Sequence, residues 1–292
     1  MNAASYISDP ESQAVLPRML PCIAPLFVPA DRPERYAKAA ASGADAIVID
    51  LEDAVAPEKK GAARAELYKA KALPKDSPVY IRLNGTTTPW YAEDVSAARG
   101  LEVTGVILPK AENIAGIASL AAALGGREII ALIESAEGLA AARDIARAGT
   151  VARLAFGSID FCADLGVAHT REALLMARSE LVLASRLGGL APPLDGVTTD
   201  IGNASLAEDD ARYASALGFG GKLCIHPVQI RPVFQGFTPG AEEIAWAERV
   251  LAASAEGAEK VGEAMVDAPV RARARQIIAR RDRVNLKRDA AL

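Results

Sequence analysis

Hydrophobic positions along the chain gather in short runs that alternate with longer, Ala-rich segments. Most runs are nearly continuous in Val, Ile and Leu, which is typical of strands buried on both faces of a parallel sheet. Between the runs, apolar residues recur with the helical period instead. The pattern therefore predicts eight strands separated by helices, with strands near residues 25–30, 46–53, 78–84, 105–110, 128–135, 153–160, 192–197 and 222–227.

Glycines mark the ends of several predicted helices. A helix over 114–124 is followed by Gly125, and a helix over 137–148 is followed by Gly149. A strand followed by a helix, repeated eight times, predicts an α/β fold of the (β/α)₈ or TIM-barrel type. A doubly wound open sheet is the alternative, but the sequence lacks the GxGxxG and Walker A patterns that often accompany it.

The last part of the chain departs from this alternation. Thr238-Pro239 predicts the start of a helix, and apolar residues from Ile244 onward fall on one helical face. We therefore predict a barrel catalytic domain over 1–237, including a short N-terminal extension. The C-terminal helical segment, 238–292, is expected to act as a lid or in oligomerisation.

Composition narrows the class of partner. The 292 residues include 33 Lys and Arg against 37 Asp and Glu, a net charge of −4, and 51% are hydrophobic. Such a chain is expected to fold, and its mildly acidic balance argues against nucleic acid or an anionic membrane as a partner. The three cysteines form neither a disulfide framework nor a zinc pattern. With no signal peptide and no apolar stretch of roughly 18 to 20 residues, a cytoplasmic location is expected.

Polar residues close most of the predicted strands. Because catalytic groups of such barrels lie at the C-terminal ends of the strands, these side chains are expected to converge on one rim. Glu134 and Asp160 end neighbouring strands and could together hold one Mg²⁺, which accepts one or two carboxylates plus water and substrate oxygens. The other residues at this rim are Asp50, Glu52, Asp53, Arg82, Asn84, Lys110 and His226.

Each of these residues also has a structural interpretation. The acids that follow the second strand could cap a helix, and Arg82 could be an ordinary ion-pair partner. Glu134 could instead stabilise the N-terminus of the following helix. The hypothesis of a site rests on the joint placement of the residues.

Seven motifs, in order, resemble those of one known family. They are LFVPADRPERYAKAAASGADAIVIDLEDAV, VYIRLNG, GVILPKAE, ALIESAEG, AFGSIDF, SELVLASRLGGLAPPLDGV and GKLCIHPVQI. The chain resembles the citrate lyase β-subunit-like proteins, the CoA-thioester lyase branch of the HpcH/HpaI aldolase family. The resemblance implies a Mg²⁺-dependent barrel lyase. Such an enzyme would cleave, or form, a 3-hydroxyacyl-CoA such as citramalyl-, malyl- or citryl-CoA, with acetyl-CoA and a 2-oxoacid as the other partners.

The same resemblance implies roles for the rim residues. Glu134 and Asp160 would hold the metal, and Arg82 would contact the substrate and stabilise enolate charge. The acids of the DLED motif would order the metal's waters and the basic groups of the site, and carboxylates there would serve in acid–base catalysis; these acids are Asp50, Glu52 and Asp53.

Basic residues after DLEDAV lie near CoA in relatives, which implies contacts from Lys59 or Lys60 and from Arg64. The MVDAPV segment resembles a C-terminal motif whose Asp reaches the active site of a neighbouring subunit, and that residue is Asp267. A shared catalytic acid or base implies a homo-oligomer, here expected to be a homotrimer. Asp267 could alternatively cap the helix that begins before Pro269.

Three other functions stay open at this level. A class II pyruvate aldolase would act on free aldehydes, although its branch carries a D-x-E-H pattern where this chain has Asp50-Leu51-Glu52-Asp53. The chain could also be the acyl lyase subunit of a multi-subunit citrate lyase. A catalytically inactive binding protein is the third alternative.

Overall fold

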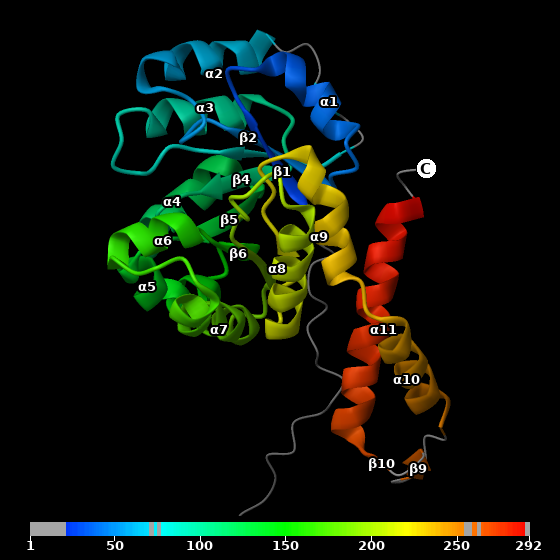
Figure 1. Ribbon diagram of the computed structural model, residues 1–292. Coiled ribbons are helices and arrows are strands. Elements are labelled where there is room, and N and C mark those ends of the chain that lie inside the picture. The colour runs from blue at the N-terminus through cyan, green and yellow to red at the C-terminus, as the bar shows by residue number, and fades with distance from the viewer. Residues whose placement is uncertain (1–21, 70–72, 75–76, 254–258, 262–263, 290–292) are drawn as a thin grey trace, which may run out of the picture.

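Eight parallel strands form the centre of the molecule (Figure 1). The computed structural model describes residues 22–69, 73–74, 77–253, 259–261 and 264–289. In the sheet each strand pairs with the next one along the chain. Their bounds are β1 Pro25–Pro29, β2 Ala46–Asp50, β3 Val79–Arg82, β4 Gly105–Leu108, β5 Glu128–Ile133, β6 Arg153–Phe156, β7 Ala191–Asp195 and β8 Gly221–Lys222.

Backbone hydrogen bonds join the last strand to the first. The Lys222 amide donates to Ile23 O at 2.8 Å, and Cys224 N donates to Pro25 O at 2.9 Å. Phe27 N in turn donates to Cys224 O at 2.9 Å. The sheet therefore curls back on itself, which confirms the prediction of a TIM-barrel-like α/β fold. β8 is shorter than predicted, because beyond Lys222 only Cys224 forms a bridge to β1.

Helices surround the strands, as Figure 1 shows. They are α1 Tyr36–Ala40, α2 Lys60–Lys69, α3 Tyr91–Gly100, α4 Ile114–Leu124, α5 Ala136–Arg147, α6 Ser158–Leu165, α7 Arg171–Leu187, α8 Ala204–Leu217 and α9 Ile230–Phe237, with 3₁₀ turns at Pro33–Arg35, Pro57–Lys59 and Pro227–Gln229. The bounds of α4 match the prediction. Its first amides donate to the Asn113 side chain, and it ends at Gly125 with φ of +62°, a left-handed conformation that glycine adopts without strain.

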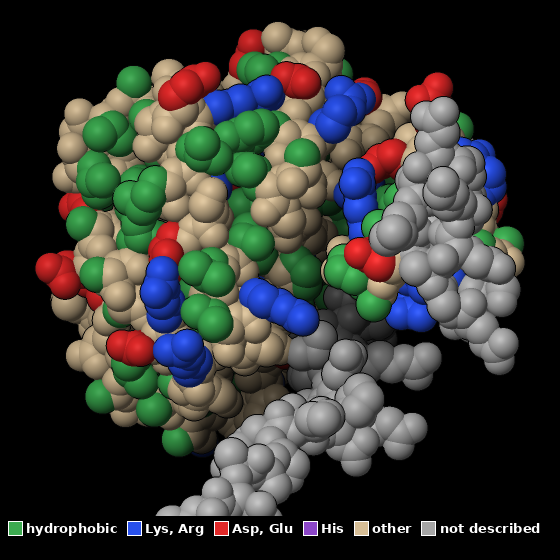
Figure 2. All heavy atoms as spheres, turned by 90° about the horizontal axis from the view of Figure 1, so that it is seen from below, with side chains coloured by type: hydrophobic (Ala, Val, Ile, Leu, Met, Phe, Trp, Pro, Cys, Tyr) green, Lys and Arg blue, Asp and Glu red, His purple; other side chains and the backbone are tan. Residues whose placement is uncertain are grey.

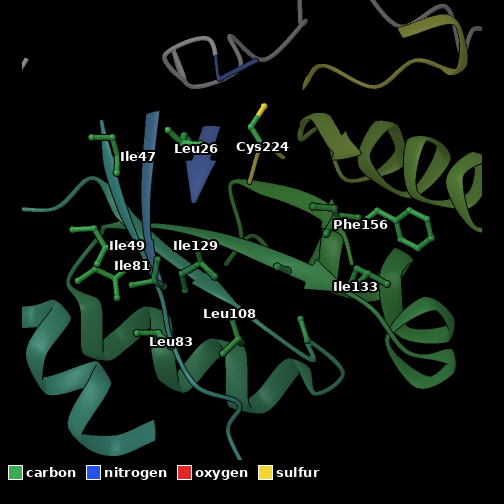
Figure 3. Close-up of a cluster of buried hydrophobic side chains, with 14 of the residues drawn as sticks. Leu26, Ile47, Ile49, Ile81, Leu83, Leu108, Ile129, Ile133, Phe156 and Cys224 are labelled. Carbon is green, nitrogen blue, oxygen red and sulfur yellow. The ribbon is translucent and has the colours of Figure 1, made fainter. Parts of the chain in front are cut away.

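Alternate residues along each strand enter two different parts of the core. On β2, Ala46 and Val48 pack inside the barrel, whereas Ile47 and Ile49 pack against the helices. Figure 3 shows this outer layer, with Ile47 and Ile49 near other buried side chains of neighbouring strands. This period of two decides which polar residue at the end of a strand faces the barrel mouth.

The C-terminal segment forms a helical pair beside the barrel. It consists of α10 Ala241–Ala252, a hairpin of β9 Glu259–Val261 and β10 Ala264–Val266, and α11 Ala268–Asp289. Figure 1 shows the pair to one side of the strands, and its two helices share an apolar cluster that includes Ala247 and Ile277. The predicted start at Thr238-Pro239 is wrong by two residues. The Thr238 hydroxyl instead donates to Phe234 O and closes α9, and Gly240 precedes α10.

The surface mixes charges of both signs. Figure 2 shows Lys and Arg side chains interspersed with Asp, Glu and hydrophobic side chains on the face it presents. Cys22, Cys162 and Cys224 are buried and form no disulfide. Within the described ranges, no helix combines the length and apolarity needed to cross a bilayer.

Candidate active site

The alternation of the strands carries several charged side chains into one cavity. Inside the barrel, Tyr80 is followed two residues later by Arg82, Val48 by Asp50, and Leu132 by Glu134. The cavity measures about 430 Å³. Its wall contains Asp50, Asp53, Arg82, Glu134 and Asp160, together with apolar residues that include Phe27, Leu132, Phe156, Val197 and Leu223. The predicted convergence of these five charged residues is therefore observed.

Arg82 is held in one orientation by the acids of β2 and the turn after it. Its Nε and Nη2 donate to the two carboxylate oxygens of Asp50 at 2.7 and 2.6 Å. Its Nη1 lies 3.1 Å from Glu52 Oε2 and 3.2 Å from Asp53 Oδ2. Most N–H donors of the planar guanidinium therefore face these carboxylates, and the pair with Asp50 has the bidentate geometry that fixes its orientation. Although burial would lower the pKa of Arg82, hydrogen bonding to Asp50 and the neighbouring carboxylates raise it.

Asp50 also fixes the turn that follows it. Its two oxygens accept hydrogen bonds from the backbone amides of Glu52 and Ala54 at 2.9 and 3.0 Å. One carboxylate thus satisfies the turn and orients Arg82. The local-capping interpretation and the ordering of a basic group are both observed for this residue.

Glu134 is almost fully buried at the end of β5. Its Oε1 accepts the backbone amide of Lys110 at 2.9 Å, and Lys110 adopts φ of +47°, unusual for a residue other than glycine. Glu134 Oε2 is buried and has no hydrogen-bond partner among the described residues. Burial, together with the charges of Glu52 and Asp160, raises the pKa of Glu134 to about 8.

Gly157 allows Glu134 to take this position. A Cβ added at Gly157 would overlap the Glu134 carboxylate, so only glycine fits there. Gly157 precedes α6, and Asp160 lies in the first turn of that helix, where it is exposed to the cavity. The two carboxylates therefore lie near one another on consecutive strand ends.

The cavity contains more negative than positive charge. Against Arg82 stand Asp50, Glu52 and Glu134, all largely buried. Burial and the charges of Asp53 and Asp50 raise the pKa of Glu52 to about 7. In the described part of the chain, no three His, Cys, Asp or Glu side chains gather closely enough to hold a metal by themselves. A cation here would draw one or two protein carboxylates and complete its coordination with other oxygens.

The basic residues of α2 and the turn before it lie outside this cavity. Lys59 is exposed, whereas Lys60 Nζ is buried and donates to the carbonyls of Leu51 and Glu52 at 2.8 and 2.9 Å. Arg64 pairs with Asp94 at 2.9 Å and with Glu93. The Lys60 ammonium and the Arg64 guanidinium are therefore both engaged with other groups of the protein.

Asp267 begins the last helix. Its Oδ1 accepts the Val270 amide at 3.0 Å, so it caps α11. The side chain is exposed, and α11 begins at the far end of the C-terminal pair from the strands (Figure 1). The structural interpretation of this residue is thus confirmed within one chain.

One contact of the cavity wall was not expected from the sequence. The Ser158 hydroxyl is buried, lines the cavity and lies 3.0 Å from His169 Nε2. His169 lies outside every motif and just before α7, so spacing alone gave no signal. Only tertiary packing brings the two residues together.

Comparison with known proteins gives one consistent family. A family model described as HpcH/HpaI aldolase/citrate lyase matches residues 24–227. A citrate lyase subunit beta-like protein of Mycobacterium tuberculosis is 42% identical over 265 residues, covering 87% of this chain and 94% of that relative. An L-malyl-CoA/beta-methylmalyl-CoA lyase of Cereibacter sphaeroides is 32% identical over 273 residues, covering 82% and 85%.

Two solved structures extend the match to the fold. The M. tuberculosis CitE protein in complex with magnesium, acetoacetate and coenzyme A superposes with a TM-score of 0.80 at 38% identity, covering 89% of this chain and 98% of that one. The M. tuberculosis citrate lyase beta subunit complexed with oxaloacetate and magnesium gives a TM-score of 0.67 at 38% identity, covering 74% and 96%.

Proposed function

The chain belongs to the HpcH/HpaI aldolase/citrate lyase family, and from this premise we propose that it is a Mg²⁺-dependent carbon–carbon lyase. Its substrate would be a 3-hydroxyacyl-CoA of the malyl, citramalyl or citryl type, cleaved to acetyl-CoA and a 2-oxoacid or formed from them. One observation carries the proposal: a buried Glu134 oxygen, which has no hydrogen-bond partner among the described residues, lies in the same cavity as Asp160 and Arg82.

The residues present fit a magnesium ion. Glu134 offers one oxygen that nothing in the described chain satisfies, and Asp160 adds a second carboxylate from the next strand end. Mg²⁺ prefers oxygen ligands and commonly takes one or two carboxylates, with substrate oxygens and waters completing the octahedron. When bound, Mg²⁺ would polarise the carbonyl of the 2-oxoacid. The relatives crystallised with magnesium and either oxaloacetate or acetoacetate support this assignment.

Arg82 supplies fixed positive charge opposite the carboxylates. Cleavage of a 3-hydroxyacyl thioester leaves the enolate of acetyl-CoA, and a guanidinium beside that oxygen stabilises the charge as it develops. Asp50 holds Arg82 through two hydrogen bonds, so the guanidinium needs little reorganisation during the reaction. We assign Asp50 to positioning Arg82.

A carboxylate near Arg82 would move the proton. Removal of the substrate hydroxyl proton, or its delivery to the enolate carbon, needs a group that titrates near neutral pH. Burial gives Glu52 a pKa of about 7, and Asp53 lies on the cavity wall beside it. Glu52 and Asp53 are therefore candidates, with Asp267 of an adjacent subunit as the third.

The assembly in this proposal is a homotrimer with shared sites. Asp267 is exposed on a helical pair that stands beside its own barrel, which suits contact with a neighbour. Asp267→Asn and Glu134→Gln should each be inactive alone, whereas a reassembled mixture should regain part of the activity. A monomer in solution, or full activity of Asp267→Asn, would contradict site sharing.

Coenzyme A completes the proposed ligand set. Lys59 is the exposed basic residue of the three expected near CoA, whereas Lys60 and Arg64 would first have to release their protein partners. We place the protein in the cytoplasm, which the three thiols without disulfides support.

The deciding experiment is an assay of Mg²⁺-dependent acetyl-CoA release from malyl-, citramalyl- and citryl-CoA. We expect turnover of at least one thioester, abolished by EDTA and restored by Mg²⁺. Absence of turnover with all three, in a folded protein that binds Mg²⁺, would reject the proposal. Turnover of a free hydroxyacid without CoA would instead favour the aldolase alternative.

A further inference from the structure

A second cavity of about 150 Å³ lies beside the first. That volume is about ten times the roughly 15 Å³ needed to hold one water. The two cavities share only Val197 in their walls. The second is formed by the N-terminal part of α7, the segment after β7, α8 and β8. Its lining includes Arg171, Arg178, Thr199, Asp210 and Lys222.

Two buried cations of this cavity share one buried carboxylate. Asp195 Oδ1 accepts Arg178 Nε at 2.8 Å, and Asp195 Oδ2 lies 3.3 Å from Lys222 Nζ. All three side chains are at least nine-tenths buried. Lys222 also donates to the Gly196 carbonyl at 2.5 Å, a neutral acceptor. Among these three described side chains, the buried cluster therefore carries one more positive than negative charge.

Arg178 keeps donors for a further partner. Its Nε is satisfied by Asp195, but neither Nη nitrogen has a hydrogen-bond acceptor among the described residues. The guanidinium lies near the rings of Phe156 and Tyr213, at 5.6 and 5.8 Å from their centroids. Neither Nη is among the fully buried polar atoms that lack a partner, so both keep accessible surface at a residue that lines the cavity, where a ligand oxygen can accept from them.

The rim of the cavity adds one cation and two carboxylates, all more exposed to solvent than the buried cluster. Arg171 pairs with Asp209 at 2.7 Å and with Asp210 at 3.0 Å. Asp210 also accepts the Thr198 hydroxyl at 2.8 Å, and Asp209 is largely exposed to solvent. Three cations thus line the cavity, and of the three carboxylates that pair with them only Asp195 is as deeply buried as Arg178 and Lys222. Solvent screens the two rim carboxylates more strongly than the buried charges. Besides burial, the charges of Arg178 and Lys222 lower the pKa of His169.

We propose that this second cavity binds a small oxyanion, a phosphate or a carboxylate, with Arg178 and Lys222 as its buried charged contacts. The first amides of α7 also favour a negatively charged ligand, since a helix N-terminus carries partial positive charge. Thr199 lies exposed at the edge and can line the entrance. This site uses none of the charged residues assigned to the metal, to Arg82 or to CoA.

Calorimetric titration of the full chain in EDTA, at constant ionic strength, tests the proposal. The probes are inorganic phosphate and acetate. We expect one of them to bind at one site per chain, and the tighter probe identifies whether phosphate or carboxylate is the preferred chemistry. Arg178→Gln should weaken that binding by roughly tenfold or more, the effect of losing a charge-assisted hydrogen bond.

A second variant keeps the test decisive if Arg178→Gln does not fold. Thr199→Asp places a carboxylate at the exposed edge of the cavity and should weaken binding by a similar factor while the thermal transition is retained. Arg143→Gln is the matched control, since Arg143 is an Arg paired with an acid, Glu180, and lines neither cavity. Binding of neither probe, unchanged binding in Thr199→Asp, or equal weakening in Arg143→Gln would overturn the proposal.

Discussion

Two clusters of buried charged side chains lie side by side in this barrel, one with an excess of negative charge and the other with an excess of positive charge. Around the first cavity, carboxylates outnumber cations, and burial raises the pKa of Glu134 to about 8 and that of Glu52 to about 7. Around the second, two cations share Asp195. Burial alone would raise the pKa of Asp195, but the charges of Lys222 and Arg178 lower it.

The difference shows how the fold selects the sign of the charge that a ligand must carry. The side chains at the centre of each cluster are buried. An uncompensated charge there therefore costs free energy until a ligand of opposite charge binds. The first cluster therefore favours a cation and the second an anion.

The largest effect is expected from removing a carboxylate of the first cluster. Glu134→Gln or Asp160→Asn should abolish detectable Mg²⁺ binding and lower kcat/KM by on the order of 10³-fold or more, since metal polarisation of an oxoacid is worth several kcal/mol. Calorimetry with Mg²⁺ and the acetyl-CoA release assay measure the two effects. Asp164→Asn is the control, because Asp164 lies on the same helix but outside the cavity. Normal Mg²⁺ affinity in Glu134→Gln would remove that residue from the metal site.

The second cluster should respond to loss of its only buried carboxylate. Asp195→Asn leaves Arg178 and Lys222 buried without their partner and should lower the free energy of unfolding by about 3 to 5 kcal/mol. Urea denaturation measures the loss. Asp209→Asn removes an exposed partner of Arg171 and should change stability by less than about 1 kcal/mol. Equal stability of the two variants would mean that Asp195 does not balance a buried charge.

The first cluster should also make the stability of the metal-free protein fall as pH rises from acid to neutral values. Because the pKa of Glu134 is raised from its ordinary 4.5 to about 8, its contribution to stability is complete below pH 4.5 and is lost as pH rises towards 8. The loss should approach ~1.4 kcal/mol per pH unit in that window. Denaturation of wild type and Glu134→Gln in EDTA, at several pH values, isolates the effect. A difference between the two proteins that does not change from pH 5 to pH 8 would contradict it.

The site that the sequence revealed is the one built from strand ends. Asp50, Arg82 and Glu134 each follow an apolar run, and the period of two along a strand is a local property that survives folding. Their convergence could therefore be predicted. The role of Gly157 could not, because the overlap that a Cβ would cause there depends on where β5 places Glu134.

The second cluster could not be predicted from the sequence for a related reason. Arg178 lies in the middle of a helix and Lys222 in a short strand, and both look like ordinary surface charges in the sequence. Packing of α7 against β6 and β7, with β8 paired to β7, buries them around Asp195. The basic residues after DLEDAV show the converse. Their motif suggested CoA contacts, but the structure engages Lys60 and Arg64 with the protein itself.

A smaller and more selective effect is expected at Arg82, the only cation among the described charged residues that line the first cavity. Arg82→Lys preserves the charge but cannot reproduce the fork that binds both oxygens of Asp50, so its ammonium would sit less rigidly beside the developing enolate. We expect kcat to fall by roughly 10²-fold, the order of losing one preorganised oxyanion donor, with a smaller change in KM. Arg99→Lys, on the exposed end of α3, should leave both constants unchanged. If KM rises while kcat is kept, Arg82 binds the substrate equally in the ground and transition states. The first cluster would then owe its chemistry to its carboxylates alone.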